Sequence, residues 1–292
     1  MIIDRETDYV FFSALLASDV RYTAAYLKVS QVLDRHQVRH GLLKGTKDIW
    51  CRDYMPIQKG DAEYVQFRYA PSYLSKYAAL QTDPKVTLEL NQIQATYSHI
   101  NLNGGNVVRW QDRVIITDRV FSENPAYANK SQLISELEKL LEAEVIVIPQ
   151  IKSDMTGHAD GLVRFYDRTT LIGNCLEAEY GYWKNGMRKV LKTHSLDYIS
   201  LPFLDYKVKG FPESAVGCYV NYLEVSDLIM VPVFEVKGNK DEEVINLLSE
   251  VFPDRTVEPV NINEVARHGG LLNCISWNVK SPACSNVTAL HL

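Results

Sequence analysis

Apolar residues recur at helical spacing in several stretches of the chain and predict amphipathic helices. The three main stretches are residues 21–36, 131–144 and 239–252, and a further helix is expected over 185–194. In the third stretch, Val244, Leu248 and Val251 fall on one face and acidic residues fill the first turn. Asn239 is placed to cap the start of that helix.

Short apolar runs flank each predicted helix and have the length of strands. Those before the last three helices are residues 114–118, 170–174 and 228–232. Those after them contain a proline and are residues 145–149, 198–202 and 255–260. The first helix lies between the runs 10–16 and 38–45. The strands that precede the helices recur with a period of roughly 57 residues, which indicates a repeated strand–helix–strand unit. Because such a unit cannot bury its own apolar faces, we expect the units to pack around a shared centre.

Polar residues suited to catalysis or binding recur with nearly the same period. They lie in the stretches DIWCRDYMP, NLNGGNVV, GHADGLVRF, GCYVNYLEV and NCISWN. One residue from each gives the series Asp53, Asn106, His158, Asn221 and Cys274, separated by 53, 52, 63 and 53 positions. If each unit places one such residue at the end of an inner strand, all five meet in a central pocket. Cys274, which has no activating neighbour in sequence, would find its partners there.

Composition favours one globular domain. The chain has 292 residues, 46% of them hydrophobic and 23% charged. It contains no linker rich in Pro, Gly or Ser and no low-complexity tract. We therefore expect a single catalytic domain over residues 1–292.

Charge and cysteine content narrow the function classes. A net charge of -5 gives no electrostatic footprint for nucleic acid and is compatible with a cationic substrate. The sequence lacks an apolar run of about 18 residues, so we expect no membrane span. Its N-terminus carries acids where a signal peptide would carry Lys or Arg. The five cysteines form no C-x-x-C pair, which argues against a disulfide framework or zinc site. The expected location is the cytoplasm.

The recurring residues suit attack on a guanidinium group. Cys274 offers a thiolate and His158 a group that transfers protons near neutral pH. Carboxylates from Asp53, Asp160 and Asp48 would oppose an oxyanion in acyl transfer, because like charges repel. They would instead hold a planar cation whose N–H groups match carboxylates in pairs. The central carbon of that cation would be open to Cys274.

Each motif alone has a simpler structural interpretation. Cys274 could be a buried small apolar residue. His158 and Asp160 could be a metal-ligand pair or a structural histidine–carboxylate pair. Arg52 and Asp53 could pair structurally beneath Trp50. The sequence NGGN is most often a turn, and Asn221 could be a ladder or turn residue. Only the shared phase of the five stretches favours a common site.

Taken together, the stretches resemble the agmatine deiminases and the bacterial-type peptidylarginine deiminases. DIWCRDYMP is similar to their D-x-W-x-R-D-x-x-P motif, GHADGLVRF to G-H-x-D, GCYVNYLEV to Y-x-N-F, and HGGLLNCISWN to the C-terminal G-G-x-x-x-C element. NGGNVV is similar to the glycine-pair strand. The resemblance implies a pentein fold, which is a five-bladed α/β propeller with a pseudo-fivefold repeat around a central active-site pocket.

The resemblance also implies residue roles. Cys274 would form a covalent amidino-thioether with release of ammonia, His158 would be the general acid and base, and Asp160 and Asp53 would grip the guanidinium. The substrate-binding set is expected to comprise Trp50, Asp48, Arg52, Asn103, Asn106 and Asn221. The product would be a ureido compound, formed without a metal or organic cofactor.

Departures from the family pattern leave alternatives open. In the family the residue before the glycine pair is usually an acid, whereas here it is Asn103. The residue before the nucleophile is usually a histidine, whereas here it is Asn273. Arg68, if it pointed inward, could receive a substrate carboxylate. The expected substrate is a small agmatine-like guanidinium compound, with peptidyl-arginine as the second candidate. An amidinotransferase and a non-catalytic binding propeller are further alternatives, and the protein could be a homo-oligomer.

Overall fold

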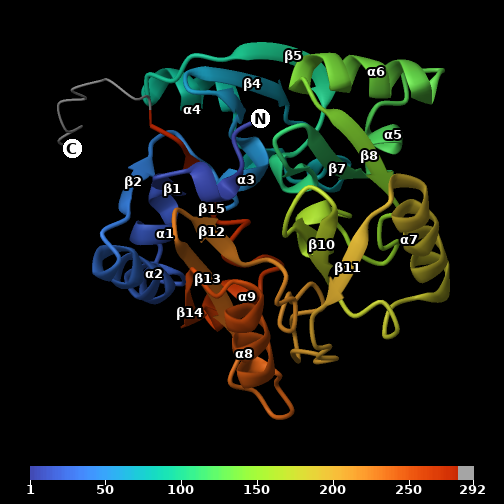
Figure 1. Cartoon of the computed structure of the whole chain (residues 1–292). Coiled ribbons are helices and arrows are strands. Elements are labelled where there is room, and N and C mark those ends of the chain that lie inside the picture. The colour runs from blue at the N-terminus through green and yellow to red at the C-terminus, as the bar shows by residue number, and fades with distance from the viewer. Residues whose placement is uncertain (282–292) are drawn as a thin grey trace.

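The computed structural model describes residues 1–281, in which the strands form five three-stranded sheets of one topology. In each sheet the central strand pairs antiparallel with one neighbour and parallel with the other. The sheets lie around a common centre (Figure 1). The repeated unit predicted from the spacing of apolar runs is therefore present, and the α/β class is confirmed.

The strand bounds follow the chain from sheet to sheet. The first sheet contains β15 (Ser276–Val279), β1 (Tyr9–Ser13) and β2 (Arg39–Leu43). The second contains β3 (Ile57–Gly60), β4 (Glu63–Arg68) and β5 (Thr96–Asn101). The third contains β6 (Val108–Arg109), β7 (Arg113–Thr117) and β8 (Glu144–Ile148). The fourth contains β9 (Val163–Phe165), β10 (Thr170–Gly173) and β11 (Asp197–Ser200). The fifth contains β12 (Leu223–Val225), β13 (Leu228–Val233) and β14 (Thr256–Asn261).

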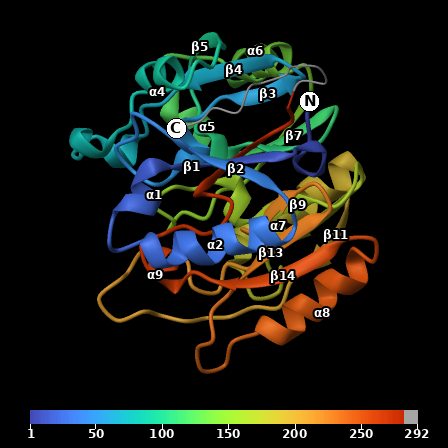
Figure 2. The same cartoon turned by 90° about the vertical axis from the view of Figure 1, so that its left-hand side faces the viewer.

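Helices connect the parallel strands and cover the outer surface. The longer ones are α2 (Thr23–Arg35), α6 (Lys130–Leu141), α7 (Gly181–His194) and α8 (Asp241–Val251). The shorter ones are α1 (Ala14–Ser18), α3 (Cys51–Tyr54), α4 (Pro84–Leu90), α5 (Arg119–Glu123) and α9 (Asn263–Ala266). Turned by 90°, the molecule shows α2 and α8 packed on the outside, near β14 (Figure 2).

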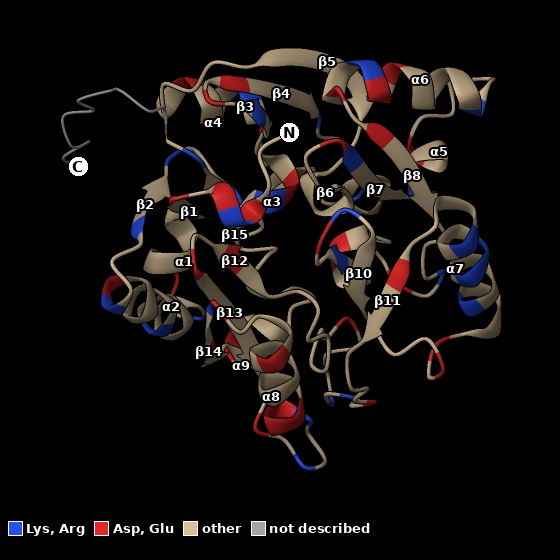
Figure 3. Cartoon of the chain, viewed as in Figure 1, with Lys and Arg blue, Asp and Glu red and all other residues tan. Residues whose placement is uncertain are grey.

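The four predicted helices are confirmed, with small shifts of their ends. In α6 the buried positions are Leu133, Leu137 and Leu141, which is the apolar face seen in the sequence. The N-cap of α8 is Lys240 and not Asn239 as predicted, but the Asn239 side chain still accepts a hydrogen bond from the Asp241 N–H at the start of the helix. Charged residues occupy the outward surfaces, with Lys and Arg along α7 and acids in the first turns of α8 (Figure 3).

The last strand of the described chain completes the first sheet. β15 pairs antiparallel with β1, with Tyr9 opposite Val279, and β1 pairs parallel with β2. Residues near the two ends of the described chain therefore share one sheet. Among residues 1–281, no helix is both long and apolar enough to cross a membrane.

Candidate active site

Residues from four of the five recurring stretches surround one cavity of about 360 Å³, and no residue of NLNGGNVV lines it. Seven residues predicted from the sequence line it, namely Asp48, Trp50, Asp53, His158, Asp160, Asn221 and Cys274. They lie in short helices and turns just before the inner strands of the sheets. The repeat thus brings distant residues together, as the spacing predicted.

Asp53 and His158 form the base of the cavity together with a glycine turn. The Asp53 Oδ1 accepts a hydrogen bond from the Gly105 N–H at 3.1 Å and lies 3.5 Å from the His158 Nδ1. On the other side of the imidazole, Asn103 Nδ2 lies 2.9 Å from His158 Nε2. The His158 imidazole and the Asp53 carboxylate are both almost fully buried. His158 is therefore held on both nitrogens, by Asp53 and by Asn103.

The glycine pair is required by close packing. A Cβ atom on Gly105 would stand 2.5 Å from Asp53 Oδ1 and 2.6 Å from His158 Nδ1. Real Cβ atoms do not approach other atoms so closely, and both neighbours are fixed by further contacts. The NGGN stretch is therefore a turn, here the 3-10 turn Gly104–Asn106, and also the element that lets two site residues meet.

Cys274 lies beside Asp160 in the same cavity. Its Sγ is 3.7 Å from Asp160 Oδ2, and its backbone N–H donates to Asn221 Oδ1 at 3.3 Å. Burial raises the pKa of the Cys274 thiol well above its ordinary value, and Asp160 and Asp53 raise it further. In the free protein the thiol therefore holds its proton at neutral pH.

Two carboxylates in the cavity titrate near neutral pH. Burial raises the pKa of Asp53 to about 6, with His158 lowering it and Asp160 raising it. Burial also raises the pKa of Asp48 to about 7, although hydrogen bonds from the Trp50 N–H and Thr82 Oγ1 lower it in part. A bound cation would favour the ionised form of both acids.

The outer part of the cavity has an apolar wall with acidic residues. Leu74, Leu80 and Met155 contribute apolar surface, and Asp154 and Glu213 contribute carboxyl groups. In the described part of the chain no Lys or Arg lines the cavity. These residues were not predicted, because they come from irregular loops without a repeated pattern.

Two further residues near the catalytic groups were also missed by the sequence analysis. Tyr73 lies with its ring 6.3 Å from that of His158 and its hydroxyl 3.3 Å from Asn103 Nδ2. Asn273 donates from Nδ2 to Asp160 Oδ2 at 2.7 Å. For Asn273 the signal was its place before Cys274, where the family usually has a histidine.

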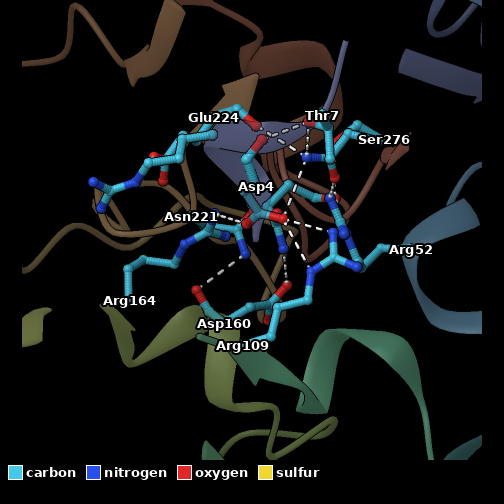
Figure 4. A network of polar contacts seen from close by, with 12 residues as sticks. Asp4, Thr7, Arg52, Arg109, Asp160, Arg164, Asn221, Glu224 and Ser276 are labelled. Atoms are coloured by element: carbon cyan, nitrogen blue, oxygen red, sulfur yellow. Dashed lines mark hydrogen bonds and ion pairs between the residues drawn. The ribbon is translucent and has the colours of Figure 1, made fainter. Parts of the chain in front are cut away.

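Arg52, which was predicted to bind substrate, does not line the cavity. Its Nε donates to the Asn273 carbonyl at 3.2 Å and its Nη2 to Asn278 Oδ1 at 2.5 Å, on the side away from the cavity. There it belongs to a buried ionic network around Asp4 (Figure 4). Arg52 and Asp53 are adjacent in the short helix α3, so their side chains point about 100° apart.

Three other predicted side chains do not line the cavity. Asn106 Oδ1 accepts hydrogen bonds from the Thr117 and Ala159 N–H groups, so it braces the turn that carries Asp160. Asn103 contacts His158 from behind and is absent from the cavity wall. Arg68 is exposed and lies outside the cavity lining, so it cannot receive a substrate carboxylate there.

The described cysteines Cys51, Cys175, Cys218 and Cys274 are all free, and Cys284 lies outside the described residues. Within residues 1–281 no three His, Cys, Asp or Glu side chains are grouped as a metal site would require.

Comparison with known proteins places the chain in a family. The model of the Porphyromonas-type peptidyl-arginine deiminase family matches residues 15–279. The chain belongs to this family. Membership confirms the enzyme class expected from the motifs, a hydrolase that acts on guanidino groups.

Individual relatives agree with this membership. A Streptococcus mutans protein provisionally named an agmatine deiminase is 23% identical, over 90% of this chain and 82% of the relative. A solved agmatine deiminase from C. jejuni has a TM-score of 0.74 at 20% identity, covering 96% of each chain. One from Enterococcus faecalis has a TM-score of 0.73 at 17% identity, covering 96% of this chain and 94% of that one. At these identities, the two solved structures show a common fold.

Proposed function

We propose that this protein is a deiminase that converts the guanidino group of a small agmatine-like substrate to a ureido group and ammonia. The observation that carries the proposal is the meeting of Cys274 and His158 with buried carboxylates in a cavity whose described lining has no Lys or Arg. Such a cavity favours a compact cation over an anion. A guanidinium presents paired N–H groups that match the carboxylates in geometry as well as charge.

Asp53 and Asp160 are proposed to hold the guanidinium from two sides. Asp160 Oδ2 is already engaged by Asn273 and Cys274, and in the described chain no hydrogen bond involves Asp160 Oδ1. That oxygen is available for a substrate N–H. The position of Cys274 beside Asp160 would then bring the sulfur close to the guanidinium carbon.

Substrate binding is proposed to activate the nucleophile. The two acids that raise the pKa of Cys274 would be neutralised by the bound cation. The thiolate would then form most readily when substrate is present, because a nearby positive charge favours it.

The proposed reaction has two steps linked by a covalent intermediate. In the first, the Cys274 proton passes to His158, the S–C bond forms, and the C–N bond breaks as His158 returns the proton to the departing ammonia. In the second, His158 takes a proton from water, the O–C bond forms and the C–S bond breaks. The thiol recovers its proton from His158, the ureido product gives up the former guanidinium proton to solvent as it leaves, and no oxidation state changes.

The outer cavity favours an amine on the substrate tail. Asp154 and Glu213 would attract a second positive charge, and Leu74, Leu80 and Met155 would contact an alkyl chain. A carboxylate on the tail would meet these acids without a lining cation to compensate. We therefore expect agmatine to be preferred over free arginine.

Ammonia release from a panel of agmatine, free arginine, an acylated arginine peptide and methylated arginines tests the proposal, with Cys274→Ala as control. Release from agmatine that is absent in the control would support it. Release from the peptide alone would favour peptidyl-arginine, and transfer to an added amine would favour an amidinotransferase. Silence across the panel, with Cys274 inert to a haloacetamidine, would reject a catalytic role and favour a binding protein.

We also propose that the five sheets are the blades of a closed propeller that folds as one catalytic domain. Support comes from their common strand order and from the pairing of β15 with β1. A single unfolding transition in calorimetry, with equal calorimetric and van't Hoff enthalpies, is expected. Two separated transitions would contradict a single domain. Cytoplasmic location and homo-oligomer formation stay predictions.

A further inference from the structure

Asn273 stands between the active-site cavity and a buried ionic network at its back. On the cavity side, Asn273 Nδ2 donates to Asp160 Oδ2, the same oxygen that lies 3.7 Å from the Cys274 sulfur. On the other side, Asn273 lines a second, small cavity together with Arg52, Arg109 and Arg164. The side chain is only 3% exposed, so both contacts are made in a water-poor setting.

The backbone of Asn273 is fixed from several directions. Its carbonyl accepts hydrogen bonds from Arg52 Nε at 3.2 Å and from Ser276 Oγ at 3.1 Å. Its N–H donates to the Asn221 carbonyl at 3.3 Å. The amide side chain therefore has a defined direction, and that direction is toward Asp160.

The placement of the Asn273 side chain lowers the stability of the fold, so a contribution to stability does not account for it. Within the described residues, Asn273 Oδ1 is buried without a hydrogen-bond partner. An unpaired buried acceptor destabilises a fold, and buried polar groups are normally satisfied. The donor half of the same amide makes a short bond to a carboxylate beside the nucleophile. A residue tolerated at such a cost next to reacting groups is more readily explained by activity than by folding.

We infer that Asn273 is a positioning residue that acts through Asp160 on Cys274. Its N–H bond fixes the Asp160 carboxylate and draws negative charge from Oδ2, which weakens the hold of that oxygen on the thiol proton. With Oδ2 occupied, Oδ1 is directed to the guanidinium. The catalytic part of this inference rests on the proposed function. The effect of Asn273 on the Cys274 thiol can be measured without turnover.

The test measures the alkylation rate of Cys274 by iodoacetamide in Asn273→Asp and Asn273→Ala, by mass spectrometry of the peptide that contains Cys274. This readout separates Cys274 from the other cysteines. In Asn273→Ala we expect alkylation at pH 8 to slow about tenfold, equivalent to one unit in the pKa of the thiol. Asn273→Asp adds a second carboxylate beside Asp160, so alkylation should slow further and kcat/KM for agmatine should fall about a hundredfold.

Asn124→Asp is a matched control. Asn124 is also a buried asparagine, but it bonds to the Asn101 and Val120 carbonyls and lies outside the active-site cavity. The Asn124→Asp substitution should lower the melting temperature without changing the alkylation rate of Cys274 or kcat/KM.

Folded Asn273 variants that are alkylated at the wild-type rate would overturn the inference, whatever their stability. If Asn273→Asp fails to fold, Asn273→Ala decides alone. If wild-type protein turns over no guanidine while the Asn273 variants still slow alkylation, the substrate proposal fails and the role of Asn273 stands.

Discussion

Asp160 is expected to have opposite effects on the nucleophile and on the substrate. It raises the pKa of Cys274 in the free protein, yet it is proposed to hold the guanidinium during the reaction. Asp160→Asn should therefore speed alkylation of Cys274 while lowering kcat/KM by a factor of about 100 to 1,000. Rates of iodoacetamide alkylation and of ammonia release on the same preparation check both directions. A loss of both activities together would indicate damage to the fold instead.

Asp48 gives a second prediction at this scale, because burial raises its pKa to about 7. The ordinary pKa of an aspartate is near 3.8, so above that pH the folded state holds a proton that the unfolded state releases. Asp48 therefore lowers the free energy of unfolding as pH rises above about 3.8. Asp48→Asn removes the cost and should stabilise the fold by about 1–3 kcal/mol at pH 8. The gain should be much smaller at pH 4, where the folded state is protonated and the unfolded state is close to its ordinary pKa.

Thermal unfolding of wild type and Asp48→Asn at the two pH values measures this difference. A gain of equal size at pH 4 and pH 8 would show that desolvation of the charge is not its source. The same variant should bind agmatine more weakly, since stability and function oppose each other at a buried charge.

At the scale of elements, the turn Gly104–Asn106 sets how closely Asp53, which precedes the second sheet, approaches His158, which precedes the fourth. Gly105→Ala would place a Cβ within 2.6 Å of both Asp53 Oδ1 and His158 Nδ1. We expect kcat/KM to fall at least about a hundredfold, because displacement of a catalytic group by about 1 Å has effects of that size. Gly181→Ala is the control, since a Cβ at Gly181 meets nothing within 4 Å. Ammonia release by the two variants makes the comparison, and equal rates would contradict it.

Periodicity could predict the elements that are long enough to show it. The amphipathic faces of α2, α6 and α8 repeat over three or more turns, and the central strands are continuous apolar runs. The inner strands were expected beside the polar residues, but their bounds could not be predicted because they are too short to show alternation, and β6 has two residues. The crossover between β4 and β5 was also missed, because it contains short turns and α4 where the other units have a long helix.

The site was predictable only where spacing or motif carried it. Asp53, His158 and Cys274 lie in phase along the chain, so their meeting follows from the repeat. Asn273 and Tyr73 have roles that depend on contacts across sheets, which no local pattern records. Arg52 was placed with Asp53 because the two are adjacent in the motif, and the sequence does not show that in the helical turn α3 their side chains point in different directions.

At the scale of the whole molecule, Asp4 ties several sheets together behind the cavity. Its carboxylate accepts hydrogen bonds from Arg109 at 2.7 Å, from Arg164, and from Asn278 at 3.3 Å (Figure 4). Burial raises the pKa of Asp4, but Arg109, Arg164 and Arg52 outweigh it and hold the pKa well below its ordinary value. The stabilisation is therefore present above the ordinary pKa and is lost as pH falls below it.

Asp4→Asn should destabilise the fold by about 3–5 kcal/mol at pH 7, because it leaves buried arginines without their partner. The difference from wild type should shrink in acid. Asp112→Asn, which breaks a half-exposed pair with Arg168, should cost about 1 kcal/mol or less. Urea unfolding of both variants at pH 7 and at about pH 2, below the ordinary pKa of Asp4, is the measurement. Similar small losses in the two variants would mean that Asp4 does not join the sheets.

The pairing of β15 with β1 also has a consequence for protein synthesis. On the ribosome, β1 emerges more than 250 residues before its antiparallel partner, and Cys274 emerges immediately before that partner. From the emergence of Asp160 until that of Cys274, 114 residues later, the nascent chain therefore carries the carboxylates and His158 without the thiol. The first sheet and the nucleophile are completed by the same short segment, so the sulfur chemistry can begin only when the fold is finished.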